Sequence, residues 1–344
     1  IRDRRSTVAA ELDARGSGAS LMRCELGRLT ERDVTLLIRD LSRSASLAER
    51  LGPRIAEASD GVPLFALELV RDLESRGVLA RLPSGAAVET QPIEALQVPV
   101  AVRDLLAARL ADLTKSERAL LDVGAVQGHV FDPALTATVL EREPVEVLHD
   151  LGSLERRGGL VRTDGARMRF DHHQVQALVY GALSQPLRED YHAGVAHALL
   201  DTGGVEGLDD ASRVTLCQHL LKGGRGAEAL PLLDPVTDHL VASHRHDEAI
   251  AVALDALDLE GLLVGAERAE RLRRTAGWLH LLGRSEEEHA LLEEAVGLAD
   301  APHDLRRAAR VRADLGRCLQ RLSRYDEAEA VLRRSIDDAV SAGD

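Results

Sequence analysis

Four short segments in the C-terminal half of the sequence share one pattern, in which an arginine is followed three residues later by a glutamate. They are Gly224-Arg225-Gly226-Ala227-Glu228-Ala229, His244-Arg245-His246-Asp247-Glu248-Ala249, Gly283-Arg284-Ser285-Glu286-Glu287 and Ser323-Arg324-Tyr325-Asp326-Glu327-Ala328. In the last three copies the arginines stand 39 (245 to 284) and 40 (284 to 324) residues apart. A turn that recurs at this interval predicts stacked helix–turn–helix units, a solenoid, because one helix pair cannot bury its apolar face alone.

These units resemble tetratricopeptide (TPR) repeats over residues 185–344. The last copy matches best, with Leu315-Gly316 before the turn and Ala328 after it. Since the interval exceeds the usual length of about 34 residues, longer helices or turns are expected. The resemblance implies a concave groove for a protein or peptide partner or a small inducer, with a rigid spacer or dimerisation surface as the alternative.

The composition favours a mainly α fold. Hydrophobic residues make up 45% of the chain but aromatic residues only 2%, so the cores must consist of leucine, valine and alanine. No apolar run is long enough to predict a membrane span. The cysteines Cys24, Cys217 and Cys318 are far apart, which predicts neither a disulfide framework nor a zinc site and favours the cytoplasm. A net charge of −14 disfavours general nucleic-acid binding.

The first part of the chain predicts a small helical domain. Helices are expected at about residues 31–41, 47–59 and 63–77. Thr30 fits an N-cap, Gly61 ends one helix and Pro63 begins the next. Residues 21–26 fit a short buried strand. Residues 80–97 contain many Pro, Gly and small polar residues and predict a linker.

The middle of the chain predicts a winged-helix domain, in which one β-hairpin closes a cluster of helices. Helices are expected at about residues 116–126, 132–140 and 143–157. Asp164-Gly165 between two extended runs predicts the hairpin turn, and a further helix begins at His172. Because helix N-termini attract anions, His172 fits a phosphate sensor, with a simple helix-capping role as the alternative. The neighbouring His173 is expected to be exposed.

No catalytic residue or metal ligand is predicted from local motifs. A phosphate-binding P-loop requires a lysine directly after glycine, whereas Lys115 follows a threonine and Lys222 follows a leucine. The chain also contains no CxxC, HExxH, GxSxG or GxGxxG motif. We therefore expect that it is not an enzyme by itself.

Further motifs occur in a characteristic order along the chain. They are a Leu-(Ser/Thr)-x-x-(Asp/Glu) helix start at Leu29-Thr30-Glu31-Arg32-Asp33, Gly-x-Pro-Leu-Phe at Gly61-Val62-Pro63-Leu64-Phe65, a Pro-x-x-hydrophobic-Arg helix from Pro99 to Leu110, Gly-x-x-Phe at Gly128-His129-Val130-Phe131, Phe-x-His from Phe170 to Tyr180, and Arg-x-x-(Tyr/Leu)-His from Arg188 to His192. In this order they resemble the middle and C-terminal part of the STAND class of signal-transduction ATPases, as found in large bacterial regulators.

The resemblance implies a nucleotide-linked role for three residues. Gly61 and Pro63 would line the adenine side of the nucleotide pocket. His172 would contact the β-phosphate of ADP and hold a closed, inactive form. The chain departs from the family pattern at Gln176 and Ala177, where Arg-Glu is common, which puts a salt bridge there in doubt.

The resemblance also implies four domains. They are a remnant of a nucleotide-binding domain with its last strand at residues 1–29, a small helical (lid) domain and linker at 30–95, a winged-helix domain at 96–184 and TPR-like repeats at 185–344. The P-loop, the Walker B acid and the bound ATP or ADP with Mg²⁺ would belong to residues before Ile1 in a longer protein, so this fragment itself has no cofactor.

The function implied is regulatory: a fragment of a STAND ATPase that couples nucleotide state to a sensor or effector, within a full-length protein that oligomerises. Its output domain would be a DNA-binding domain, a kinase or a cyclase. The alternative is a TPR-type interaction module with a purely structural winged helix. A third reading, direct DNA binding, is disfavoured because the expected recognition helix at residues 143–157 is acidic.

Overall fold

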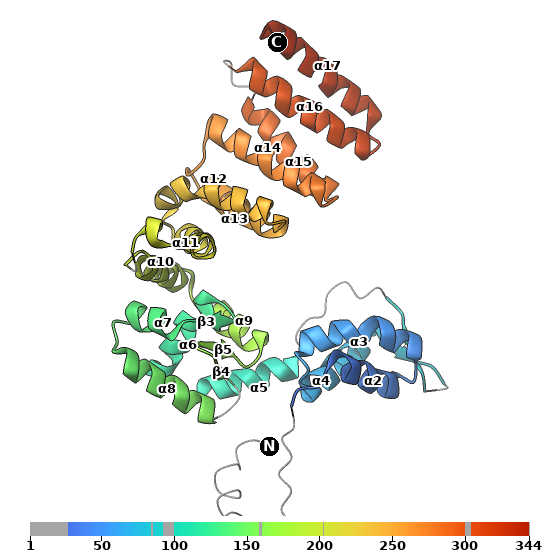
Figure 1. Cartoon of the computed structure of the whole chain (residues 1–344). Helices are drawn as coiled ribbons and strands as arrows, with labels where there is room; N and C mark the ends of the chain where they lie inside the picture. Colours follow the sequence, from blue (N-terminus) through green and yellow to red (C-terminus); the bar gives the residue numbers. More distant parts are fainter. Residues whose placement is uncertain are drawn as a thin grey trace, which may run out of the picture. The chain divides into compact units, whose positions relative to one another are not determined.

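The computed structural model describes residues 27–83, 85–91, 100–157, 160–201, 203–299 and 304–343. The chain divides into two compact units, Ile1–Ser184 and Gln185–Asp344, and each is taken by itself below (Figure 1). Helices dominate both units, which confirms the mainly α fold. The strand expected at residues 21–26, which includes Cys24, lies outside the described residues. Within the described ranges, no helix has the length and apolar character needed to cross a membrane.

Three helices form the first part of unit 1: α2 (Glu31–Ser42), α3 (Ala45–Ser59) and α4 (Pro63–Ser75). Thr30 caps α2, and its capping box is completed by the side chain of Asp33. Aliphatic side chains such as Val34, Ile38 and Leu69 fill the core between the three helices. The helices expected from the apolar periodicity are therefore confirmed.

Part of the expected linker is a β-hairpin. β1 (Leu79–Arg81) pairs antiparallel with β2 (Ala87–Glu89). Leu79 and Ala87 are buried in the core of the three helices. The prediction of a linker over residues 80–97 is thus wrong as far as Glu89, because the Pro and Gly residues belong to a turn between two short strands.

The rest of unit 1 runs in the order α5 (Val100–Ala111), α6 (Lys115–Gln127), β3 (Val130–Phe131), α7 (Pro133–Val139), α8 (Pro144–Arg157), β4 (Val161–Asp164), β5 (Arg167–Phe170) and α9 (His173–Ala182). The strands form one antiparallel sheet in the order β3-β5-β4. Gly165, with φ of 62°, makes the expected turn between β4 and β5. The third strand, β3, was not expected, because two residues are too few to show an alternating pattern.

Helices α6, α7 and α8 lie where the sequence predicted them, and they pack with the sheet around one core. Phe131 from β3 and Phe170 from β5 contact each other with ring centroids 5.3 Å apart. Leu120 of α6 and Leu151 of α8 are fully buried in the same cluster. Two of the three phenylalanines of the chain therefore lie in this one core.

Unit 2 is a series of helices: α10 (Gln185–Asp201), the short 3₁₀ helix η2 (Val205–Gly207), α11 (Asp210–Lys222), α12 (Gly226–Ala242), α13 (His246–Asp258), α14 (Gly265–Leu281), α15 (Ser285–Ala299), α16 (Leu305–Arg321) and α17 (Tyr325–Ser341). Each α-helix packs on the next one along the chain. One continuous core of Leu, Val and Ala side chains runs through the series and includes Trp278. This arrangement is the helical solenoid that the repeated segments predicted.

The four repeated turns have the same backbone geometry. The residue before each arginine is in the left-handed region, with φ of 68° at Gly224, 58° at His244, 71° at Gly283 and 61° at Ser323. Each arginine N–H donates to the carbonyl oxygen five residues earlier, which closes the preceding helix. Each guanidinium then pairs with the glutamate three residues later. The recurring sequence therefore specifies one local structure.

The series is irregular at its start. The first two turns stand 20 residues apart (225 to 245), and a single helix, α12, lies between them (Figure 1). Helices α11, α12 and α13 are thus joined by two equivalent turns, whereas a longer connection separates α13 from α14. Regular pairs begin only with α14 and α15.

Candidate functional site

His172 is buried at the start of α9, with only 3% of its surface exposed. It is the N-cap, and its Nδ1 accepts a hydrogen bond from the backbone N–H of Gln174 at 3.0 Å. Its ring meets Phe65 edge-on at 4.8 Å and stacks on His173 at 4.4 Å. The structure thus brings the Phe65 segment and His172 together, although they are far apart in the sequence.

The chemistry of His172 follows from this environment. Burial lowers the pKa of His172 to about 4, helped by His173 and opposed by the carbonyl of Ser59. The ring is therefore neutral at physiological pH. Because Nδ1 accepts a hydrogen bond, the proton lies on Nε2. Nε2 is buried without a hydrogen-bond partner among the described residues, although the Ser59 backbone lies near enough to raise the pKa. In the described part of the chain, Nε2–H is therefore a neutral donor with no acceptor in hydrogen-bond geometry.

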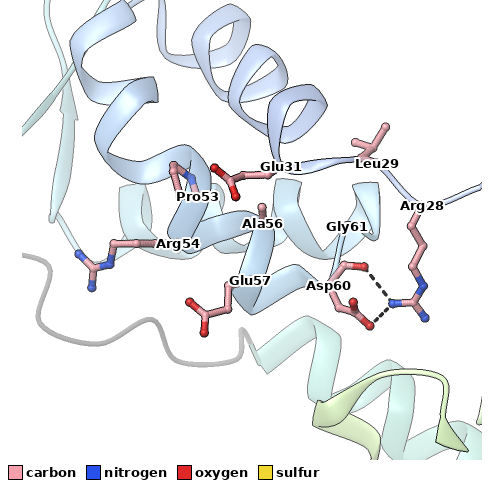
Figure 2. A pocket seen from close by; sticks show the side chains of 9 residues that line it. All are labelled: Arg28, Leu29, Glu31, Pro53, Arg54, Ala56, Glu57, Asp60 and Gly61. Carbon is pink, nitrogen blue, oxygen red and sulfur yellow. Dashed lines mark hydrogen bonds and ion pairs between the residues drawn. The ribbon is translucent and has the colours of Figure 1, made fainter.

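Arg28 connects three segments beside this histidine. One guanidinium nitrogen donates to the backbone carbonyl of Asp60 at 2.9 Å and pairs with its carboxylate (Figure 2). The other nitrogen binds the backbone carbonyl of Asp171 and, at 3.1 Å, its Oδ1. Asp60 is the C-cap of α3, and Asp171 directly precedes His172. Arg28 could not be predicted from local sequence patterns, because its partners lie 32 and 143 residues away.

The backbone conformation and close packing at Gly61 require a glycine. Its φ is 65°, and a Cβ there would lie 2.2 Å from the carbonyl oxygen of Leu29. The Leu29 N–H also donates to the Gly61 carbonyl at 2.9 Å. Pro63 is exposed and occupies the first position of α4, where a missing N–H costs nothing. As nucleotide contacts, Gly61, Pro63 and His172 stay predictions.

A cavity of about 520 Å³ opens beside Gly61. Arg28, Leu29, Glu31, Pro53, Arg54, Ala56, Glu57, Asp60 and Gly61 line it (Figure 2). Two arginines and three carboxylates give it a mixed charge. Neither Pro63 nor His172 belongs to its lining, so the three predicted contacts do not share one cavity among the described residues.

Two further histidines lie near the junction. Burial lowers the pKa of His129 and of His173, whereas the Asp60 carboxylate raises both. His173 is half-buried, which corrects the expectation that it is exposed. In the described part of the chain, no group of three metal-ligating side chains could hold a metal ion.

The two departures from the family pattern in α9 have plain structural roles. The amide nitrogen of Gln176 donates to the carbonyl oxygen of Ala125 at 2.7 Å and so ties α9 to α6. Ala177 is exposed. The Gln176 hydrogen bond fixes α9 behind His172 without a salt bridge.

Helix α8 lacks the surface of a DNA-reading helix. Arg157 at its end pairs with Glu117 of α6, and Glu155 binds the backbone N–H and hydroxyl of Thr163. The exposed residues near its start include the apolar Val145 and Leu148 and the polar Glu146 and His149. The exposed arginines of α8, Arg156 and Arg157, lie in its last turn. Base readout requires a basic field, whereas the start of α8 exposes apolar side chains and Glu146.

Neither a protein-family model nor a curated protein matches this chain. Among solved structures, it is similar to a STAND protein with a tetratricopeptide repeat sensor from Pyrococcus horikoshii, at 15% identity and a TM-score of 0.39. That likeness covers 92% of this chain and 42% of the other, so the chain spans less than half of that protein's length. A putative kinesin light chain from Podospora anserina with TPR-like repeats is similar over 45% of this chain and 87% of its own, at 16% identity and a TM-score of 0.30.

Proposed function

We propose that this chain is the regulatory arm of a STAND-type ATPase, which couples nucleotide state to a sensor or effector in the cytoplasm. In this proposal residues 96–184 are a winged-helix domain and unit 2 is a TPR-like sensor. ATP or ADP with Mg²⁺ would be held by a nucleotide-binding domain preceding these residues in the full-length protein. The chain itself would carry out no catalysis.

The observation that carries this proposal is the junction at His172. Phe65 of the Gly61-to-Phe65 segment packs on His172, and Arg28 ties both sides together through Asp60 and Asp171. The buried, neutral Nε2–H of His172 could donate a hydrogen bond to a phosphate oxygen. A hydrogen bond to such a charged group contributes about 1.5–3 kcal/mol. That energy suffices to bias a switch toward its ADP-bound form.

The same energy is too small to bind a nucleotide alone. Association costs at least about 4 kcal/mol in lost translational and rotational freedom. The described residues offer the Nε2–H of His172 as a hydrogen-bond donor to a phosphate. They offer no P-loop lysine, since neither lysine of the chain follows a glycine. We therefore expect this chain by itself to bind no nucleotide measurably.

Calorimetric titration of Mg·ADP tests both statements. The isolated chain should give no heat of binding, and micromolar affinity would overturn that expectation. In the full-length protein, His172→Asn should weaken ADP binding by about tenfold, because asparagine keeps the N-cap acceptor but cannot extend a donor to the Nε2 position. His149→Ala, which removes an exposed histidine of α8, is the control. Equal affinities for the two variants would contradict the role of His172.

A second function is supported by a separate observation in unit 2. Cavities of about 450 and 370 Å³ open against α14, one beside α12 and one beside α16. Such hollows between repeats favour an interaction module that binds a protein or peptide partner, in which the winged helix is only structural. If the full-length protein had no nucleotide-binding phosphate loop, the role in a STAND-type ATPase would be excluded. The role as an interaction module would be unaffected.

A further inference from the structure

The cavity beside α16 has one apolar wall. It has a volume of about 370 Å³ and is lined by residues of α14, α15 and α16. Trp278, Leu292 and Gly277 form part of its lining. A Cβ at Gly277 would meet nothing within 4 Å, so the missing side chain leaves this wall open. The Arg274 guanidinium lies over the Trp278 ring, 5.7 Å from its centre.

Two arginines of α16 supply unused donors on the opposite wall. Arg317 binds Asp314, and Arg321 binds Glu288, each through one terminal nitrogen. A guanidinium carries five N–H donors, so both side chains keep several for another acceptor. The side chain of Arg317 is 63% exposed and can reorient toward a ligand. These residues therefore offer paired donors to a carboxylate.

A buried carboxylate completes the cavity. Glu288 on α15 is 4% exposed, and its Oε1 accepts from Arg321. Its Oε2 has no hydrogen-bond partner, and the half-exposed ring of His280 lies 3.7 Å away. An unsatisfied buried acceptor is destabilising, and a donor that enters beside His280 would relieve that cost. The cavity thus requires both an acceptor group and an N–H group from its occupant.

We propose that this cavity binds an acidic peptide segment. Its carboxylates would pair with Arg317 and Arg321, an N–H would donate to Glu288 Oε2, and its aliphatic stems would lie along Trp278. The chain has a net charge of −14, but fields from distant charges are screened beyond about 8 Å in physiological salt, so the local arginines decide. The proposal rests on the interaction-module function of unit 2 and is independent of His172.

Trp278 reports on the cavity directly, because it is the only tryptophan of the chain. Its emission should change saturably when a hexaglutamate peptide with blocked ends is titrated into the full chain. A hexalysine peptide should produce no saturable change. Arg317→Gln should raise the half-saturating concentration by about tenfold or more, because it removes charge-assisted hydrogen bonds. Gly277→Leu should abolish the response by filling the open wall.

Arg333→Gln is the matched control. Arg333 is also an exposed arginine held by one carboxylate of its own helix, Glu329, but it lies on α17 outside the cavity. This variant should respond like the unaltered chain. No saturable response to hexaglutamate, an equal response to hexalysine, or an equal loss in Arg333→Gln would overturn the proposal. If glutarate bound as tightly as the peptide, the inference that the occupant is a peptide would be overturned. Because nucleotide is absent from every arm, failure here leaves the role of His172 unaffected.

Discussion

The junction at Arg28 and the repeated turns of unit 2 both use an arginine that binds carboxylates, but over very different distances along the chain. Arg28 binds Asp60 and Asp171, which lie 32 and 143 residues away. Each turn arginine, such as Arg245, binds the glutamate three residues later. The Arg28 contacts hold distant segments together. The turn arginine–glutamate pairs lie on turns that backbone hydrogen bonds already close.

Exposure sharpens this difference. The side chain of Arg28 is 25% exposed, and each of its nitrogens also binds a backbone carbonyl. The carboxylate that Arg245 binds belongs to Glu248, three residues later, and both side chains of this pair are exposed to solvent. Exposed pairs of this kind contribute little, because water and salt screen them and the side chains lose entropy. The same residue type therefore has a structural role in unit 1 and a marginal one in unit 2.

Removing Arg28 is the strongest test of this comparison. Arg28→Ala should lower the free energy of unfolding of unit 1 by about 2–3 kcal/mol, because it leaves two partly buried carboxylates and two carbonyls without a donor. Hydrogen exchange in α3 and α9 should increase, whereas Trp278 fluorescence, which reports on unit 2, should keep its midpoint. Arg245→Ala should leave stability unchanged, because its pair with Glu248 is exposed. Equal losses in the two variants would remove the distinction between the arginines.

Gly316→Ala tests whether close contacts between neighbouring helices limit unit 2. A Cβ at Gly316 would lie 2.5 Å from two carbons of Leu332 on α17, so α16 and α17 would have to separate locally. We expect a loss of about 1–2 kcal/mol, after allowing for the better helix propensity of alanine. Circular dichroism during urea unfolding measures it. Gly277→Ala, where the methyl meets nothing, should instead stabilise α14, and the same sign for both would contradict the packing argument.

Acid should weaken unit 2 through a buried histidine pair. Nδ1 of His192 on α10 lies 2.7 Å from Nδ1 of His219 on α11. Burial lowers the pKa of His192 to about 3 and that of His219 to about 4. The neighbouring His219, Lys222 and Arg188 lower the pKa of His192 further, and Lys222 lowers that of His219. The unfolded chain therefore takes up protons first, so stability is complete above pH 6.5 and falls as the pH drops toward 4.

The expected loss between pH 7 and pH 6 is about 1 kcal/mol for the pair, a window in which ordinary carboxylates do not titrate. Urea unfolding followed by Trp278 emission measures it. His219→Asn should roughly halve the slope of stability against pH, whatever its effect on stability itself. A slope unchanged by this variant would show that other groups take up the protons.

The range of a contact also explains what the sequence could predict. The turn arginines and the Asp164-Gly165 hairpin are encoded within a few residues, and both were found from the pattern alone. The position of His172 at a helix start was predicted on the same local grounds. Its burial against Phe65 was not, because that contact depends on how two distant helices pack.

The missed features are non-local or very short. Nothing around Arg28 signals its partners, since one of them follows it by 143 residues. The Arg317 and Glu288 cavity combines three helices, and no single segment shows it. The β1–β2 hairpin was missed for a different reason: its strands are three residues each, and the Pro and Gly between them are equally typical of linkers.

Ser323→Gly should give the smallest effect, and it tests whether the turns of unit 2 are specified by the backbone alone. Gly224 and Gly283 occupy the left-handed position in two turns, but His244 and Ser323 occupy it in the others. A residue with a side chain is strained there, whereas glycine is not, so Ser323→Gly should stabilise the chain by about 0.5–1 kcal/mol. Gly283→Ser should destabilise it by a similar amount. Thermal unfolding measures both, and a destabilising Ser323→Gly would mean that side-chain contacts, as at Arg28, also hold these turns.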